Sequence, residues 1–138
     1  MLLEKNVNLY TEEKDIVSTF EAVLVNNIDS ISNGSISNMI CHFIDKIPLS
    51  EKQNFLHVML NKLKSGGKLR LAFIDFERFK IQLYRDQISQ DDFNTIIKSI
   101  DSLWTTEQII SFVKTLKNFV ISEYFIERNL THIFIEKK

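Results

Sequence analysis

The sequence predicts an α/β fold in which helices cover a mostly parallel β-sheet whose last strand runs antiparallel to its neighbour. Three observations support this prediction. Short apolar segments alternate with segments of helical periodicity along most of the chain. A glycine pair, Gly66-Gly67, separates a helical segment from the most strand-like one. Residues 120–127 and 131–136 are both β-rich and lie close enough to form a closing hairpin.

Length and composition exclude several classes of protein. The 138 residues suffice for one domain with an apolar core and are too few for two of ordinary size, so residues 1–138 are expected to form one domain. The formal net charge is −1 and both signs are interspersed, which indicates neither nucleic-acid nor membrane binding. A lone cysteine, Cys41, and the absence of a signal peptide or membrane span predict a cytoplasmic protein without a metal site.

The first part of the chain contains three strand candidates. Residues 6–10 alternate polar and apolar side chains, residues 19–25 form a stronger β-rich segment, and residues 37–43 are apolar enough for an inner strand. The Ser/Asn-rich residues 26–34 are predicted to form a surface loop, with Gly34 at its turn.

A capped helix is predicted to follow these strands. Ser50 is placed to cap the first backbone N–H groups, and Gln53 is placed to complete a capping box. The apolar positions recur at spacings of three and four, so one helix face packs against a sheet. We expect the helix to end near Lys64, Gly66 to be left-handed beyond that end, and residues 68–74 to form the principal strand.

Helical periodicity returns in the second half. The apolar residues of segment 77–101 fit two helices broken near Ser89, which offers a cap. A further helix is predicted to begin at Thr105 or Thr106, and Gln108 follows Thr105 at the spacing of a capping box. This helix leads into the closing hairpin.

Four sequence blocks occur in the order and spacing of a known family. They are Ile44-Asp45-Lys46, Leu63-Lys64-Ser65-Gly66-Gly67, Ile74-Asp75-Phe76-Glu77 with Leu83-Tyr84 after it, and Trp104-Thr105-Thr106-Glu107-Gln108. They resemble blocks of class I S-adenosylmethionine-dependent methyltransferases, where a Leu-Glu-His-like turn, Leu-Lys-Pro-Gly-Gly and Pro-Asp-Phe-Glu occupy the first three places. The resemblance covers roughly the last three quarters of the chain and implies an incomplete Rossmann-like fold of class I methyltransferase type, which ends in an antiparallel strand pair.

The glycine-rich loop that this resemblance implies is missing. In the family it follows the first strand, because only residues without a Cβ let backbone N–H groups approach the cofactor closely. All three glycines lie too late in this sequence. The resemblance leaves Glu12 or Glu13 as candidates for the ribose hydroxyls and Asn26 or Asp29 for the adenine amine, with an ordinary charged loop as the alternative.

Two residues at predicted strand ends are candidates for catalysis. His42 has an imidazole that titrates near neutrality, although a lone histidine is more often an ordinary polar contact. Asp75 leaves the principal strand where open parallel sheets bind ligands, and is equally well placed to cap the next helix. Cys41 is predicted to be a core residue, and the spacing of His57 and His132 predicts no metal site.

Three functions remain open. The favoured one is a degenerate, non-catalytic methyltransferase-like domain that binds no cofactor and acts as an interaction or structural module. The others are an S-adenosylmethionine-dependent methyltransferase with an atypical or partner-completed cofactor site, and an unrelated small α/β binding protein. Losing the glycine loop removes several cofactor hydrogen bonds of about 0.5–1.5 kcal/mol each. Losing the central strand predicts either direct pairing of its neighbours or an edge covered by a protein partner or a homo-oligomer.

Overall fold

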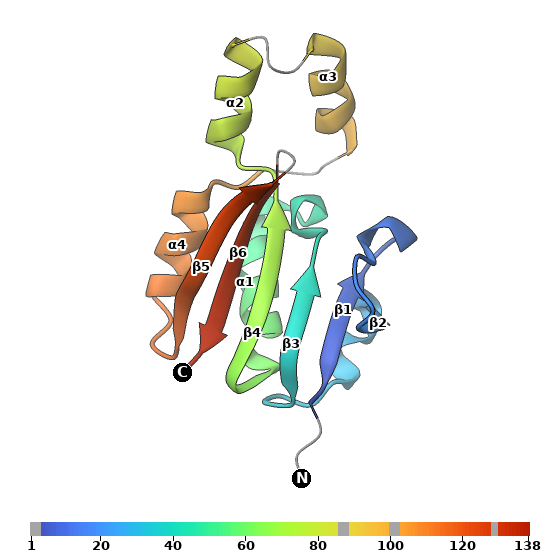
Figure 1. The fold of residues 1–138 in the computed structure, drawn as a ribbon, viewed down its shortest axis with the longest axis vertical. Helices are drawn as coiled ribbons and strands as arrows, with labels where there is room; N and C mark the ends of the chain where they lie inside the picture. The colour runs from blue at the N-terminus through green and yellow to red at the C-terminus, as the bar shows by residue number, and fades with distance from the viewer. Residues whose placement is uncertain (1–3, 86–88, 100–102, 128–129) are drawn as a thin grey trace.

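One six-stranded sheet, in the order β2-β1-β3-β4-β6-β5, organises the chain (Figure 1). The computed structural model describes residues 4–85, 89–99, 103–127 and 130–138. The strands are β1 (Asn6–Tyr10), β2 (Glu21–Leu24), β3 (Ile36–Cys41), β4 (Leu63–Phe73), β5 (Phe119–Glu127) and β6 (Leu130–Lys137). β1 to β4 are parallel, and β6 lies antiparallel between β4 and β5. The predicted α/β class and the antiparallel closing pair are confirmed.

Within the described ranges, four α-helices and three short 3-10 helices connect the strands. They are η1 (Glu13–Asp15), η2 (Val25–Ser30), η3 (Ile44–Lys46), α1 (Leu49–Asn61), α2 (Phe76–Tyr84), α3 (Gln90–Ser99) and α4 (Thr106–Lys114). α2 and α3 extend beyond the end of β4, at the top of Figure 1, and contact each other through the stacked rings of Phe79 and Phe93. None of the helices in the described part of the chain is long and apolar enough to cross a membrane.

The core lies between one face of the sheet and helices α1 and α4. Alternate strand residues such as Leu9, Met39 and Leu71 are buried in it and belong to the same cluster as Leu56 of α1 and Val113 of α4. This pattern follows from the two-residue period of strands and the three-to-four-residue period of helices. Both helices that pack on the sheet thus contribute to one apolar face.

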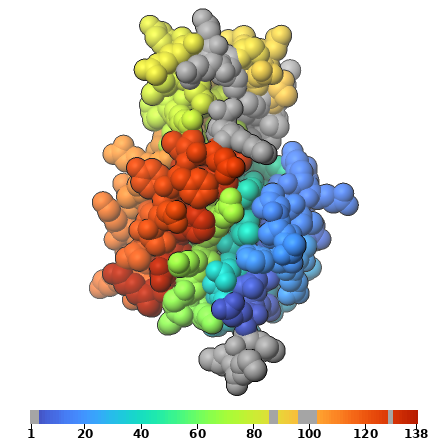
Figure 2. Space-filling model, viewed as in Figure 1, coloured from blue at the N-terminus to red at the C-terminus, as the bar shows by residue number. Residues whose placement is uncertain are grey.

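The opposite face of the sheet, which we call the helix-free face, carries Asn38, Ile40, Arg70 and Phe134. These residues alternate with core residues along β3, β4 and β6. In the space-filling view, atoms of β3 and β4 reach the surface between the blue amino-terminal segment and the red hairpin (Figure 2). Parallel sheets are ordinarily covered on both faces, so this exposure is unusual.

Two predictions about α1 and its end are wrong in detail. The helix begins at Leu49 with Pro48 as its N-cap, and the Pro48 carbonyl accepts the first helical hydrogen bonds. Ser50 therefore lies inside the first turn, and the predicted Ser50–Gln53 capping box does not form. Gly66 does have a positive φ of 80°, but it lies within β4, because pairing with β3 begins as early as Leu63.

The predicted loop at residues 26–34 and two predicted helix caps can also be compared with the structure. Residues 26–34 are only partly a loop, because Ile28 and Ile31 reach the core and the chain between them is helical. The capping box of Thr105 and Gln108 is confirmed. So is the cap offered by Ser89. Residues 86–88 and 100–101 of the predicted helical segment and residues 128–129 of the predicted hairpin connection lie outside the described residues.

Candidate functional site

The carboxyl ends of the parallel strands line one edge of the sheet, here called the carboxyl edge, where open α/β sheets bind ligands. Of the predicted site residues, Glu12, His42 and Asp75 follow β1, β3 and β4 at this edge. Asn26 and Asp29 lie in η2, after β2, with exposed side chains. Among the described residues, no hydrogen bond or ion pair joins any two of these five side chains. Their roles in a common site stay predictions.

The turn after β1 is closed by its own hydrogen bonds. Oδ2 of the buried Asp15 accepts from the Thr11 backbone N–H at 3.0 Å, the Thr11 hydroxyl at 2.8 Å and the Glu12 backbone N–H at 3.0 Å. Burial opposes ionisation of Asp15, but these hydrogen bonds outweigh it and lower its pKa. Asp15 Oδ2 is therefore occupied by hydrogen bonds from its own chain.

Glu12 points toward a lysine from a neighbouring strand end. Lys46 Nζ lies 3.0 Å from Glu12 Oε1 and 3.8 Å from Asp15 Oδ2. The hydrogen bond from Lys46 and the charge of Lys14 lower the pKa of Glu12. Glu13, the alternative candidate, is exposed in η1.

A buried amide that sequence reasoning missed holds the next part of this turn. Asn8 is fully buried, and its Nδ2 donates to the backbone carbonyls of Leu9 and Asp15, both at 3.0 Å. Its Oδ1 accepts from the Val17 backbone N–H at 2.9 Å and the Ser18 hydroxyl at 3.1 Å. Both ends of the Asn8 amide thus bind the connection from β1 to β2.

His42 lies beside cations and rings of the neighbouring strands. Burial, together with Arg70 and His132, lowers the pKa of His42 to about 4, so its imidazole is neutral at pH 7. The His42 and His132 rings meet edge to face with centroids 5.7 Å apart. His42 Nε2 is buried without a hydrogen-bond partner among the described residues.

Asp75 joins two helices. Its Oδ1 accepts from the Arg78 backbone N–H at 3.1 Å and so caps α2. Its Oδ2 accepts from the Thr106 backbone N–H at 2.8 Å and from the Thr106 hydroxyl, in the first turn of α4. Burial would raise the pKa of Asp75, but the Thr106 hydrogen bonds and those from the backbone lower it. The carboxylate is thus occupied by donors of its own chain.

Asp45 is a second polar residue that sequence reasoning treated only as part of a turn. Its Oδ2 accepts from the Ile74 backbone N–H at 2.8 Å, while its Oδ1 is buried without a hydrogen-bond partner among the described residues. Burial raises the pKa of Asp45 to about 6, against the opposing effects of the Ile74 hydrogen bond and the Lys52 charge. Nothing in the local pattern marks this residue, because its partner lies 29 residues away.

Comparisons with known proteins identify the architecture. No protein-family model matches the sequence, and no curated protein matches it significantly. The crystal structure of the PH0226 protein from Pyrococcus horikoshii matches with a TM-score of 0.65 and 15% identity, over 97% of this chain and 72% of that one. A SAM-dependent methyltransferase from Archaeoglobus fulgidus matches with a TM-score of 0.60 and 11% identity, over 95% and 75%. This chain has the class I methyltransferase fold.

A third structure with this fold is much longer than the chain. It is an O-methyltransferase family protein from Burkholderia thailandensis, and it matches with a TM-score of 0.63 and 13% identity. The match spans 86% of this chain and 36% of that one. At these identities the likeness establishes the methyltransferase fold alone.

The glycines of this methyltransferase fold lie away from the carboxyl edge. Gly34 precedes β3, and Gly66 and Gly67 lie in the first half of β4, so all three glycines of the sequence are at the amino ends of strands. A Cβ on Gly67 would lie 2.7 Å from the Ile36 carbonyl oxygen, which shows that this glycine is needed for close packing of β3 and β4.

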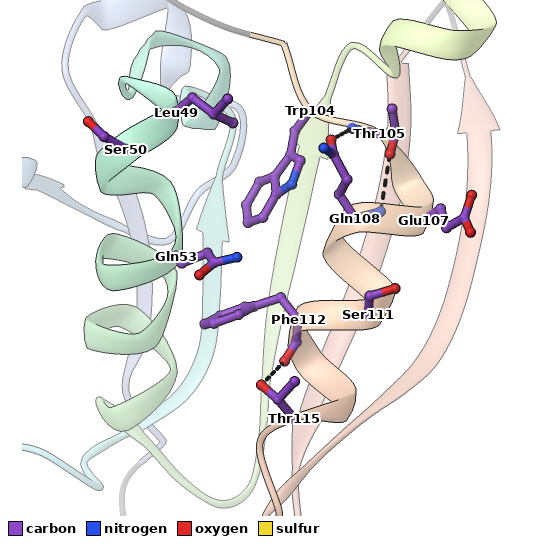
Figure 3. A pocket seen from close by; sticks show the side chains of 10 residues that line it. All are labelled: Leu49, Ser50, Gln53, Trp104, Thr105, Glu107, Gln108, Ser111, Phe112 and Thr115. Carbon is purple, nitrogen blue, oxygen red and sulfur yellow. Dashed lines mark hydrogen bonds between the residues drawn. The ribbon is translucent and has the colours of Figure 1, made fainter.

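A groove of about 820 Å³ lies between α1 and α4, on the side of the sheet that the helices cover (Figure 3). Trp104 and Phe112 project toward α1, and Gln53 faces them. Glu107 is the only ionisable residue among those that line the groove. None of the predicted site residues contributes to it.

The shifted pKa values of His42 and Asp45, which lie next to the carboxyl edge, predict opposite effects of acid on stability. The folded-state pKa of His42, about 4, is below its usual 6.5, so the unfolded chain binds the proton first and stability is lost as pH falls from 6.5 to 4. The folded-state pKa of Asp45, about 6, is above its usual 3.8, so stability is gained as pH falls through 6. Between about pH 7 and pH 5, we expect the unfolding free energy of His42→Gln to fall by about 1 kcal/mol less than that of the wild type. We expect that of Asp45→Asn to fall by about 1 kcal/mol more.

Urea unfolding of each variant at both pH values measures this difference. His57→Gln, which removes an exposed imidazole of α1, is the matched control. Identical pH dependence for wild type, His42→Gln and Asp45→Asn would contradict the assigned shifts.

Proposed function

We propose that this chain is a methyltransferase-like domain that does not bind S-adenosylmethionine and acts as an interaction or structural module for a protein partner or a second copy. The direct parallel pairing of β1 with β3, with Leu9 opposite Cys41, is the main support. β2 pairs with the other side of β1. A strand from another chain therefore has no position between β1 and β3.

β1 can be aligned with either the first or the second strand of the family, and neither alignment provides a glycine-rich loop for the cofactor. If β1 corresponds to the family's first strand, residues 11–15 stand in place of its glycine loop and contain no glycine. If β1 corresponds to the second strand, the first has no place in the sheet, because β1 pairs with β3 directly. In either alignment the chain lacks the glycines that would let backbone N–H groups approach the cofactor closely.

The side chains at the end of β1 do not fit the cofactor. Ribose hydroxyls require a free carboxylate, but Asp15 Oδ2 already accepts three hydrogen bonds and Glu12 is paired with Lys46. Binding the cofactor there would break these contacts without a glycine loop to compensate. An active methyltransferase with an atypical site is the alternative that the experiment addresses.

Calorimetric titration of the full chain with S-adenosylmethionine tests the proposal. We expect no saturable heat up to about millimolar ligand, because the carboxylates at the place of the cofactor are already bound within the chain. Saturable micromolar binding that weakens in Glu12→Gln and persists in Glu13→Gln would overturn it. Glu13→Gln is the matched control because Glu13 is adjacent and exposed.

A further inference from the structure

Arg70 lies on the helix-free face without a carboxylate partner among the described residues. The ion pairs in this part of the chain are Lys14–Glu12, Lys46–Glu12, Lys46–Asp15 and Lys80–Glu77. Arg70 is only half-exposed, and partly buried charges are ordinarily paired. Its missing counter-ion calls for an explanation.

Side chains of β5 and β6 hold the Arg70 guanidinium in place. Arg70 Nε donates to His132 Nδ1 at 3.3 Å, and Arg70 Nη2 lies 3.2 Å from the same atom. The guanidinium carbon lies 5.9 Å from the ring centroids of both Phe125 and Phe134. These cation–π contacts and the His132 contact orient the guanidinium, and its Nη1 and the outer N–H of Nη2 are left for a ligand. Little conformational entropy is then lost when an anion binds.

A small pocket opens beside this guanidinium. Its volume is about 150 Å³, and its lining residues are Phe20, Asn38, Met39, Ile40, Lys68, Arg70 and Phe134. Two of them are cationic, none is acidic, and most of the others are apolar. The pocket is smaller than the roughly 300–1,000 Å³ of ordinary cofactor sites, so its size suits a single side chain or one small ring.

We propose that this pocket binds a carboxylate carried on a small apolar group. Arg70 provides the planar donor pair for the carboxylate, Lys68 adds a second positive charge, and Phe20, Ile40 and Phe134 contact the apolar part. The ligand is either an acidic side chain of a partner protein or a free organic acid. This site lies on the sheet face and is independent of whether the carboxyl edge binds a cofactor.

Two carboxylates occupy nearby positions on the same face. Glu136 is opposite Lys68 in the β4–β6 register, and Glu123 is opposite Phe134 in the β5–β6 register. In the described structure neither forms an ion pair with Lys68 or Arg70, so both repel an incoming anion without neutralising the pocket. Glu136→Gln is therefore expected to strengthen binding severalfold at low salt.

Titration of the isotope-labelled chain by NMR tests the proposal with three probes of one shape: benzoate, benzamide and benzylamine. We expect saturable shifts of the Ile40, Arg70 and Phe134 amides with benzoate, at a dissociation constant on the order of millimolar, and none with the other two. Arg70→Gln should weaken benzoate binding at least about fivefold, and Arg70→Lys less. Lys114→Gln, on exposed α4 surface, should have no effect.

Equal binding of benzamide, or unchanged binding by an Arg70→Gln variant whose circular dichroism shows a retained fold, would overturn the proposal. Acetyl-leucyl-glutamyl amide distinguishes the two sources of the carboxylate. Tighter binding of this peptide than of benzoate assigns the pocket to a protein segment, and the reverse assigns it to a free acid.

Discussion

Gly67→Ala is expected to destabilise the fold by about 3 kcal/mol. A Cβ at this position would lie 2.7 Å from the Ile36 carbonyl oxygen and 2.8 Å from the Lys64 carbonyl oxygen. Both atoms belong to the backbone, so relief requires β3 to move away from β4 at Ile36 and β4 itself to bend between Lys64 and Gly67. The free energy of unfolding in urea measures the loss.

Gly66→Ala is the matched control for this substitution. Gly66 has φ +80°, but a Cβ there would meet no described atom within 4 Å, so the cost is limited to backbone strain of about 1–2 kcal/mol. A smaller loss for Gly67→Ala than for Gly66→Ala would show that the close contact is not limiting. Of the glycine pair that resembles the family block, Gly67 is thus the one that serves sheet packing in this chain.

Asp75→Ala is expected to cost about 2.5–4 kcal/mol. The substitution removes the cap of α2, worth about 1 kcal/mol, and the charge-assisted hydrogen bonds to Thr106 in α4, worth about 1.5–3 kcal/mol. Trp104 is buried next to this junction and pairs with Asp75 through the backbone, so its fluorescence should shift to the red if α4 loosens. Urea unfolding and the emission spectrum of the folded state measure the two effects.

Glu77→Ala provides the comparison for Asp75→Ala. Glu77 is in the first turn of the same helix, and its ion pair with Lys80 is exposed, so the expected change is below about 0.5 kcal/mol. A double-mutant cycle with Thr106→Ala isolates the link between the helices. Independent effects of Asp75→Ala and Thr106→Ala would contradict the link.

Most elements of the fold were predictable because each depends on a local pattern. The apolar spacing in α1, the capping box of Thr105 and Gln108, and the β-rich closing hairpin all lie within short windows of sequence. The early start of β4 was not predictable in this way, since it depends on pairing of Leu63 with Ile36 in another strand. At Leu63, pairing between strands overrides the local sequence signals for a longer helix.

The candidate site was harder to predict than the fold. The sequence identified Glu12, His42 and Asp75 as residues at strand ends, and the structure places them there. Their partners come from distant segments: the Thr106 that binds Asp75 is 31 residues away, and the His132 whose ring meets that of His42 lies in β6. Whether a polar side chain is free or occupied depends on such partners, which no local pattern contains.

The closed turn after β1 makes a glycine-rich loop costly to introduce at this position. A Gly-x-Gly sequence at residues 12–14 would remove the Glu12 and Lys14 side chains, and with them the ion pairs Lys46–Glu12 and Lys14–Glu12, before any nucleoside was present to replace them. Each such variant would also gain backbone entropy in its unfolded state. Variants that acquire such a loop at this position are therefore expected to be less stable than this chain.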